Sequence, residues 1–288
     1  MSDDSSRASR SRAAQRIAFL LVTAVCAQFC RAGESAPQEL SPQEEQAALR
    51  KAETTGFAIY KHDHAAAVAT DALFALGVLK SDKRLRGWIT EEQGDGILVT
   101  FFGAEANETL QAMYRISVSK EGDVTHPPQE LKVPEALTAL EMGAAEARIF
   151  AAKYSFQPCA EHYNTVVLPA DSSPSPNWVV YLLPATTDAL RIPLGGAHRL
   201  DLNTTGQNLI GERGFTRSCV VLGDPKGDPK KRPVGLFATH LMDPVPTEIH
   251  VFWNLWTGIP LYISTPPNGT IWSLSKGKIA LEKRAAAK

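Results

Sequence analysis

The stretch Pro134–Tyr154, PEALTALEMGAAEARIFAAKY, contains the clearest helical pattern of the chain. Apolar and small residues recur there in steps of three and four and line one face of a helix: Leu137, Leu140, Ala144, Ala147, Ala151 and Tyr154. Pro134 suits the first helical position, where a missing N–H costs nothing. Because an apolar helix face needs a covering surface, we expect the strand-rich run that follows to form a sheet beneath it.

The same order of elements occurs upstream. A helical pattern over Ala65–Lys80 is followed by three predicted strands: Gly87–Gln93, Ile97–Gly103 and Leu110–Val118. The helix predicted at Pro134–Tyr154 is also followed by three predicted strands: Asn164–Pro169, Trp178–Leu183 and His198–Asn203. In both third strands an arginine precedes a turn glycine by seven residues, Arg115 before Gly122 and Arg199 before Gly206. We therefore infer a duplicated helix–strand–strand–strand unit.

This repeat predicts an α+β protein with two helix-plus-antiparallel-sheet (α-β-β-β) units. We assign residues 57–128 to the first unit and 129–282 to the second, which a C-terminal β-meander extends. Residues 33–56 then form a linker or lead-in helix, and 283–288 form a tail. A period of roughly 75–85 residues fits a domain duplication, since solenoid repeats span ~20–50 residues.

The C-terminal part of the chain is rich in β-branched and aromatic residues. We predict strands at Phe215–Leu222, Val234–Met242, Thr247–Trp256, Ile259–Thr265, Thr270–Leu274 and Lys278–Leu281. Asn268-Gly269 between two of these runs is a strong hairpin signal. Because the connections are too short for crossovers, we expect an antiparallel meander.

Residues 1–32 have the pattern of a secretory signal peptide. Arginines precede the apolar run Ile17–Ala27, and small residues at Ala27 and Ala32 fit a cleavage site. A membrane-spanning helix needs ~20 apolar residues, so this run is too short for one. We expect an exported protein, periplasmic or secreted, with no transmembrane helix after signal removal. An uncleaved N-terminal anchor is the alternative.

Export changes the interpretation of the cysteines. Cys26 and Cys30 lie in the signal or at its edge, which leaves Cys159 and Cys219. An even pair in an oxidising compartment predicts a disulfide. The alternative is a nucleophile made by Cys159 and His162, but a thiol nucleophile needs a base positioned in space rather than in sequence.

Charge and missing motifs exclude several classes of function. Residues 1–32 contain five of 30 basic and two of 31 acidic residues, so 25 and 29 remain and the net charge is near −4. Nucleic-acid binding would show as a basic excess or stripe, so we expect no nucleic-acid partner. The chain contains no G-x-S-x-G elbow, phosphate loop or dinucleotide fingerprint, which removes the common hydrolase and nucleotide-binding signatures.

His62 and His64 are the candidate metal ligands of the first unit. Histidines at i and i+2 can share a metal on a strand, where alternate side chains point the same way. These two run into a helical segment instead, and Asp63 as the cap of that helix explains the cluster without a metal. We predict no metal and no other cofactor.

Candidate catalytic residues lie near the C-terminal strands: His240, Asp243, Glu248 and His250. They can meet across a hairpin that turns at residues 243–246, where they would form a carboxylate–histidine site for a metal or a general base. Histidines on a half-buried sheet face are the alternative. Trp253, Trp256 and Trp272 would bind a peptide or sugar if they shared an open face, and would otherwise fill a sheet core.

The order of a helix and antiparallel strands, with one strand ending in the polar turn Val118–Val124, resembles the PepSY or cystatin-like group of modules. As a whole the chain also resembles exported bacterial proteins. The PepSY-like resemblance implies exported α+β modules, some of which restrain peptidases. We expect a non-enzymatic module that binds a protein or peptide, with a peptidase-inhibitor-like role as one form of that binding. A hydrolase using the 240–250 region and an envelope structural or assembly protein are the alternatives.

Overall fold

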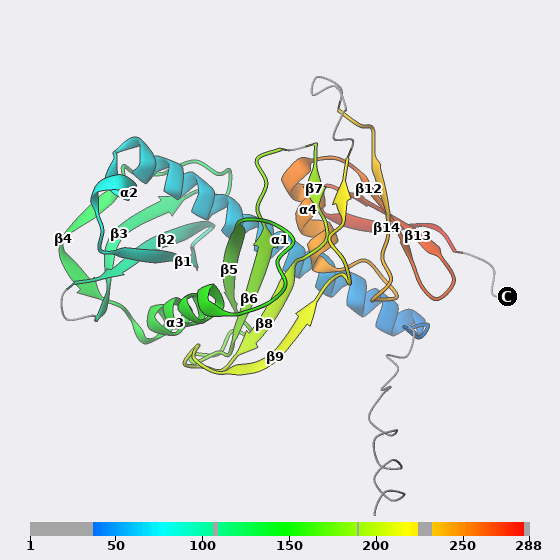
Figure 1. Cartoon of the computed structure of the whole chain (residues 1–288), viewed down its shortest axis with the longest axis horizontal. Helices are drawn as coiled ribbons and strands as arrows, with labels where there is room; N and C mark the ends of the chain where they lie inside the picture. Colours follow the sequence, from blue (N-terminus) through cyan, green and yellow to red (C-terminus); the bar gives the residue numbers. More distant parts are fainter. Residues whose placement is uncertain (1–36, 106–108, 189, 224–231, 285–288) are drawn as a thin grey trace, which may run out of the picture. The chain divides into compact units, whose positions relative to one another are not determined.

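The computed structural model of the chain describes residues 37–105, 109–188, 190–223 and 232–284 (Figure 1). The predicted signal peptide, 1–32, lies outside these residues. Within them the predicted α+β class is confirmed: three four-stranded sheets form, and the first two follow the helix-plus-sheet order. None of the described helices is long and apolar enough to cross a lipid bilayer.

In the first unit, the C-terminal half of α1 (Pro42–Ala75) packs on an antiparallel sheet. The strands follow chain order: β1 (Leu85–Gln93), β2 (Gly96–Ala104), β3 (Leu110–Val118) and β4 (Gln129–Ala136). The short helix α2 (Val78–Ser81) connects α1 to β1. Small side chains at Ala65 and Ala69 let the helix approach the sheet, and with Leu73 they pack on residues of β2 and β3 in one buried cluster.

The second unit repeats this arrangement with α3 (Ala139–Lys153). Its sheet contains β5 (Tyr163–Pro169), β6 (Trp178–Pro184), β8 (His198–Leu202) and β9 (Leu209–Gly214) in that order. Strand β6 is buried along its whole length. Trp178, Val180 and Leu182 pack toward α3, while Val179, Tyr181 and Leu183 belong to the core on the other face. A sheet covered on both faces explains the unbroken apolar run in β6.

The two glycines of the repeat have equivalent positions. Gly122 and Gly206 both adopt positive φ, 91° and 72°, in the turn after the third strand of their units. Gly122 lies beside His64 of α1, and Gly206 lies against the backbone of α3 at Gly143 and Ala147. Each glycine turn therefore contacts the helix of its own unit, so the short sequence repeat corresponds to a repeat in three dimensions.

The C-terminal sheet differs from the expected meander. It contains β11 (Leu236–Thr239), β12 (Leu261–Thr265), β13 (Thr270–Ser275) and β14 (Lys278–Lys283). The last three strands are antiparallel, and the turn at Asn268-Gly269 joins β12 to β13 as predicted. Strands β11 and β12 are parallel, however. The all-antiparallel prediction was wrong because the connection between them contains a helix.

That helix, α4 (Glu248–Thr257), replaces the strand predicted at Thr247–Trp256. Its apolar residues fit a helical face as well as a strand, and both helix ends carry terminal signals. The His250 side chain accepts the Thr247 N–H at the start (3.0 Å), and Gly258 ends the helix with φ 65°. A glycine with positive φ is a common helix terminator, and it distinguishes this run from a strand.

The observed ends of two helices also differ from the predicted ones. Pro134 lies in β4, a strand that the sequence did not predict, and α3 begins later, at a capping box between Thr138 and Glu141. Helix α1 begins at Pro42, with its own capping box at Ser41 and Glu44. Asp63 is therefore in the middle of α1, and its prediction as a helix cap was wrong.

Other strand predictions also changed. Strand β9 was not predicted, and the strand predicted at Phe215–Leu222 is limited to β10 (Val221–Leu222), which pairs with β7 (Ile192–Pro193).

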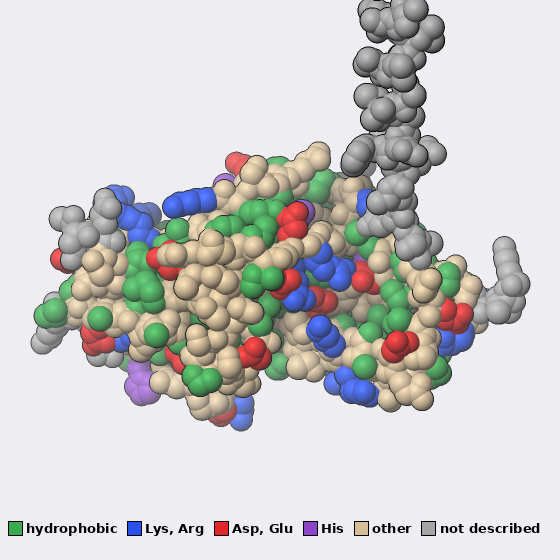
Figure 2. All heavy atoms as spheres, turned by 90° about the horizontal axis from the view of Figure 1, so that it is seen from below, with side chains coloured by type: hydrophobic (Ala, Val, Ile, Leu, Met, Phe, Trp, Pro, Cys, Tyr) green, Lys and Arg blue, Asp and Glu red, His purple; other side chains and the backbone are tan. Residues whose placement is uncertain are grey.

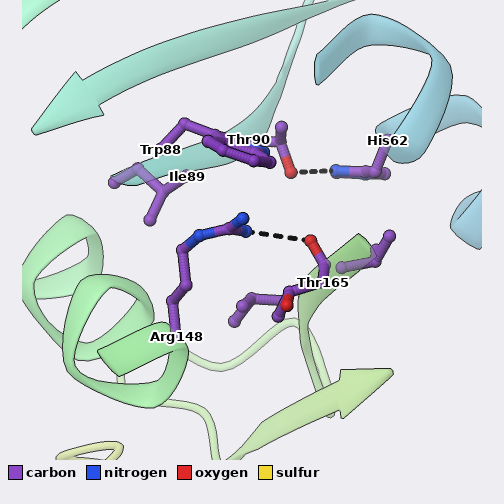
Figure 3. Close-up of a pocket in the computed structure, with 8 residues that line it drawn as sticks. His62, Trp88, Ile89, Thr90, Arg148 and Thr165 are labelled. Carbon is purple, nitrogen blue, oxygen red and sulfur yellow. Dashed lines mark hydrogen bonds between the residues drawn. The ribbon is translucent and has the colours of Figure 1, made fainter. Parts of the chain in front are cut away.

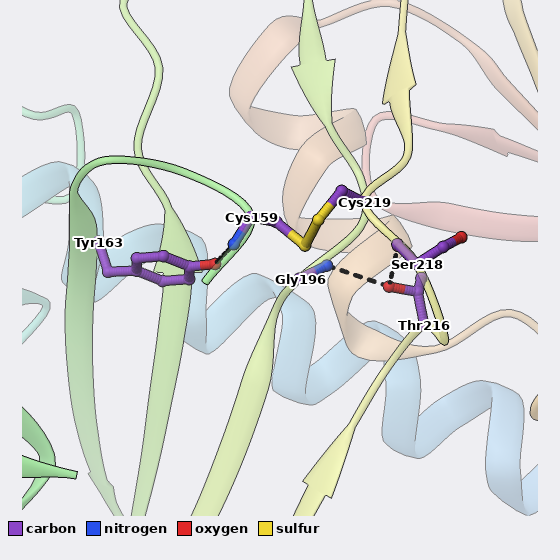
Figure 4. Close-up of a disulfide and its surroundings, with 6 residues drawn as sticks. All are labelled: Cys159, Tyr163, Gly196, Thr216, Ser218 and Cys219. Atoms are coloured by element: carbon purple, nitrogen blue, oxygen red, sulfur yellow. Dashed lines mark hydrogen bonds between the residues drawn. A yellow bond between two sulfur atoms is a disulfide. The ribbon is translucent and has the colours of Figure 1, made fainter. Parts of the chain in front are cut away.

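The predicted disulfide forms in this region (Figure 4). Cys159 lies in the loop after α3, and Cys219 precedes β10. The bond joins residues 60 positions apart in sequence.

Helix α1 contacts elements of all three sheets. Its N-terminal half crosses α4 at Gly56, where a Cβ would lie 2.5 Å from Val251 Cβ. One turn before Gly56, Glu53 accepts hydrogen bonds from the Ile279 N–H (2.8 Å) and Lys278 Nζ (2.9 Å) of β14. The first described helix is thus bonded to the last strand. On the face shown in Figure 2, acidic and basic side chains are interspersed.

We predict that Gly56→Ala lowers the free energy of unfolding by about 1–3 kcal/mol, because the added methyl group overpacks the crossing. The effect is opposed by the better helix propensity of alanine. Chemical denaturation measures it, with Lys51→Ala at an exposed position of α1 as the control. Unchanged stability of Gly56→Ala would show that the two helices separate easily at this point.

Candidate ligand-binding groove

A groove of about 530 Å³ lies between the first and second units. It is lined by Thr54, Ala58 and His62 of α1, Ile89–Glu92 of β1, Leu140, Glu141 and Ala144 of α3, Leu168–Ser172 at the end of β5, and Trp178 of β6. The volume is within the range of ~300–1,000 Å³ that is usual for ligand sites. Such sites often lie between domains.

The lining residues show how the groove runs relative to the sheets. Four consecutive residues of β1, Ile89–Glu92, line it. Because successive side chains of a strand point to opposite faces, the groove runs along the edge of β1 rather than over one face. Within the described residues, the outer edges of β1 and β5 pair with no other strand. The groove is therefore flanked by two sheet edges that carry unpaired backbone groups.

Beneath the groove, side chains from two helices close the gap between these edges (Figure 3). The Arg148 guanidinium of α3 lies 3.6 Å from the centre of the Trp88 ring on β1. It also donates a hydrogen bond to the Thr165 carbonyl of β5 (2.9 Å). From α1, His62 Nδ1 lies 2.7 Å from the Thr90 hydroxyl. A ligand can therefore approach the strand edges above this closure but not through it.

Burial controls the protonation of the titratable groups in the closure beneath the groove, which are His62, Arg148 and the neighbouring Asp63. It lowers the pKa of His62 to about 4, so the imidazole is neutral at pH 7. It raises the pKa of Asp63 to about 6, although the Asn164 amide and Arg148 favour the carboxylate. It lowers the pKa of Arg148 to about 9, opposed by Asp63. At neutral pH the closure holds a cation and a carboxylate beside a neutral histidine.

Two of the four carboxylates in the groove have cationic partners. Glu141 pairs with Arg115 of β3 (2.9 Å), and Glu92 pairs with Lys61 (2.6 Å). Burial acts to raise the pKa of Glu141, but the Thr138 N–H and Arg115 outweigh it and hold that pKa below its ordinary value. In the part of the chain that the structure describes, no ion pair involves Glu91 or Asp171, which are exposed at the groove.

The candidates at 240–250 come together, but not across a hairpin. His240 follows β11 and His250 lies in α4, and their ring centres are 4.7 Å apart. Asp243 Oδ2 lies 2.8 Å from His240 Nε2 and accepts a hydrogen bond from Arg213 at 2.7 Å. The two histidines are 3% and 2% exposed, so a substrate reaches neither ring without local opening. A catalytic role for this group stays a prediction.

Two contacts in this region have clear structural roles. His250 Nδ1 accepts the Thr247 N–H at the start of α4, and burial lowers the pKa of His250 well below its usual value. The neutral ring therefore serves as a helix cap. Glu248 accepts a hydrogen bond from the Tyr181 hydroxyl of β6 (3.2 Å), which connects α4 to the second sheet.

The metal candidates of the first unit do not converge. His62 is buried toward β1, whereas His64 is exposed and stacks on Tyr60 with ring centres 5.7 Å apart. Positions i and i+2 of a helix point in different directions, so the two rings cannot share an ion. Among the residues that the structure describes, no group of three or more His, Cys, Asp or Glu side chains is placed to hold a metal.

Two of the three candidate tryptophans are core residues, and the third is half-buried beside them. Trp253 and Trp272 are buried, and Trp256 packs edge-on against Trp253 with ring centres 5.5 Å apart. The Trp272 indole donates to Thr265 Oγ1 (2.9 Å). The Trp253 indole N–H is buried and has no acceptor within the described residues.

Comparisons of the chain with protein-family models, curated proteins and solved structures find no match. Any functional inference therefore depends on the geometry of the groove. Its lining was not predicted from the sequence, because five separated segments contribute a few residues each. The sequence signal that could have indicated the groove was the pair His62-Asp63, two polar residues on an apolar helix face. The structure buries both.

Proposed function

We propose that the protein is an exported, non-enzymatic binding module that holds an extended peptide in the groove between β1 and β5. The observation that carries the proposal is the run of consecutive β1 residues along the groove, since it exposes the strand edge to a ligand. An added strand gains backbone hydrogen bonds from such an edge and places alternate side chains in neighbouring pockets.

Other features support this proposal. The resemblance of the sequence to PepSY or cystatin-like modules, some of which restrain peptidases, is in keeping with this role. A peptidase-inhibitor-like role would use the same edge, with a partner's extended segment as the ligand. Export is favoured by the signal pattern at residues 1–32 and by the disulfide, because disulfides persist in oxidising compartments.

We predict that Ala170→Trp abolishes peptide capture. Ala170 lines the groove and is exposed, so a large side chain fills the groove without disturbing the core. A displayed random heptapeptide library is selected on immobilised full-length protein, wild type and variant in parallel. Peptides enriched by the wild type should lose at least about tenfold in affinity for the variant, a difference of about 1.4 kcal/mol.

The control is Ala280→Trp at an exposed position of β14, which should capture the same peptides as the wild type. Circular dichroism and thermal melts confirm that both variants are folded. If the enriched peptides bind Ala170→Trp as well as they bind the wild type, the groove is not the peptide site and the proposal fails.

A further inference from the structure

The charge of the groove provides a criterion for the peptide that it binds. The lining contains four carboxylates, Glu91, Glu92, Glu141 and Asp171, and no lysine or arginine. Its one histidine, His62, is neutral at pH 7 because burial lowers its pKa to about 4. The lining itself therefore supplies negative charge only.

Only two of these four carboxylates remain available to a charged ligand. Lys61 and Arg115 already neutralise Glu92 and Glu141. Glu91 on the edge strand β1 and Asp171 after β5 remain, one on each side of the groove. Asp171 accepts the Ser173 N–H (2.8 Å), which fixes its carboxylate in the turn. Two anions thus lie on the two walls of the groove, and neither has a cationic partner among the described side chains.

Between these walls the groove is largely apolar. Ala58, Ile89, Leu140, Ala144, Leu168 and Trp178 contribute to its lining. A side chain that enters must bury a hydrocarbon stem and present a charge near the carboxylates. Lysine and arginine do both, because their methylene stems cover apolar surface while the charged end stays near water. Peptides without a cation leave both carboxylates unpaired and gain only the apolar contact.

We propose that the groove selects peptides that carry a lysine or arginine flanked by apolar residues, with Glu91 and Asp171 receiving the cation. This inference rests on the proposed peptide-binding function and names the ligand class for the same site. The strand edge supplies affinity that is independent of sequence, and the two carboxylates supply the preference. Charge complementarity of this kind determines specificity more than it determines affinity.

The test compares the selected heptapeptides with the starting library. In the wild-type selection the combined frequency of lysine and arginine should rise at least about twofold over the input. The double variant Glu91→Gln, Asp171→Asn keeps the size of both side chains and the Ser173 hydrogen bond. It should bind an enriched basic peptide roughly three- to tenfold more weakly, as expected for exposed charge pairs.

The matched control is Glu212→Gln, Glu282→Gln, which removes the same charge from exposed positions on β9 and β14. It should bind as the wild type does. Binding to the wild type should also weaken when salt is raised from 0.05 to ~1 M, because salt screens exposed charges, and the double variant should lose most of this salt dependence.

The outcomes separate this inference from the function on which it rests. A basic enrichment that Glu91→Gln, Asp171→Asn abolishes supports the inference. Peptides that require an open groove, as shown by Ala170→Trp, but contain no excess of lysine or arginine overturn it and leave the peptide-binding function intact. Peptides that bind Ala170→Trp unchanged contradict both.

Discussion

Replacing both Cys159 and Cys219 by serine is expected to lower the free energy of unfolding by about 3–4 kcal/mol. The disulfide joins residues 60 positions apart, and closing a loop of this length removes much of the conformational freedom of the unfolded chain. The loss is a large fraction of the ~5–15 kcal/mol that stabilises an ordinary domain. Urea denaturation of the double variant and of the oxidised wild type measures it.

The wild type in the presence of a reducing agent provides the control, because it removes the bond without changing a side chain. Reduced wild type and double variant should have similar midpoints. A loss below about 1 kcal/mol in both would mean that the bond adds little to the folded state. The double replacement also avoids leaving one free thiol, which a single serine variant would expose to oxidation.

The second large effect concerns the pH dependence of stability at the closure beneath the groove. Asp63 is expected to make the protein less stable as pH rises. Burial raises its pKa in the folded state to about 6, from an ordinary value of 3.8. Between these values the unfolded chain loses its proton first, so stability falls by about 3 kcal/mol from pH 4 to 7 through this group. Below pH 3.8 the penalty is absent.

His62 acts in the opposite direction. Its pKa in the folded state is about 4, compared with an ordinary value of 6.5. The unfolded chain therefore takes up the proton first as pH falls, and stability is lost between pH 6.5 and 4, by about 3 kcal/mol through this group. Over the same pH range, the contributions of Asp63 and His62 to stability have opposite signs. In the wild type each contribution therefore partly cancels the other.

Single variants separate the two contributions. Relative to the wild type, Asp63→Asn should gain stability progressively from pH 4 to 7, and His62→Gln should gain it as pH falls from 6.5 to 4. The pH dependence is the quantity to compare, since Asp63→Asn also removes an attraction to Arg148 at every pH at which Asp63 is charged. Urea titrations at several pH values provide the data. Parallel curves for variant and wild type would contradict the assignment.

The parts of the fold that were predicted correctly have strong periodic patterns. The helical stripe over 137–154 and the alternating or buried runs of β1, β2, β3, β5 and β6 identify their elements locally. Helix α4 was not recognised because its residues, EIHVFWNLWT, are rich in strand formers. Its helical state depends on packing against α1 and on the terminal Gly258. Strand β4 has few apolar residues and gave no signal of its own.

The candidate site was less predictable, for two physical reasons. Burial determines whether a histidine is available, and nothing near His240 or His250 in sequence indicates that both rings lie in the interior. The groove, in turn, exists only where two sheet edges meet, and the sequence does not specify which strands are edges. Helix α3, which the sequence predicted only to cover a sheet, also contributes Leu140, Glu141 and Ala144 to the groove.

The bonds between Glu53 of α1 and the β14 residues Lys278 and Ile279 affect how the chain reaches its final state. A polypeptide leaves the ribosome N-terminus first, so α1 is complete long before its partners α4 and β14 exist. Until those partners are synthesised, Gly56 and Ile59 on α1 remain exposed to solvent. Contacts between such distant segments are slow to form, and an exposed apolar helix face is a target for chaperones. Folding of this protein is thus completed only after residues 248–283, which contain α4 and β14, have emerged.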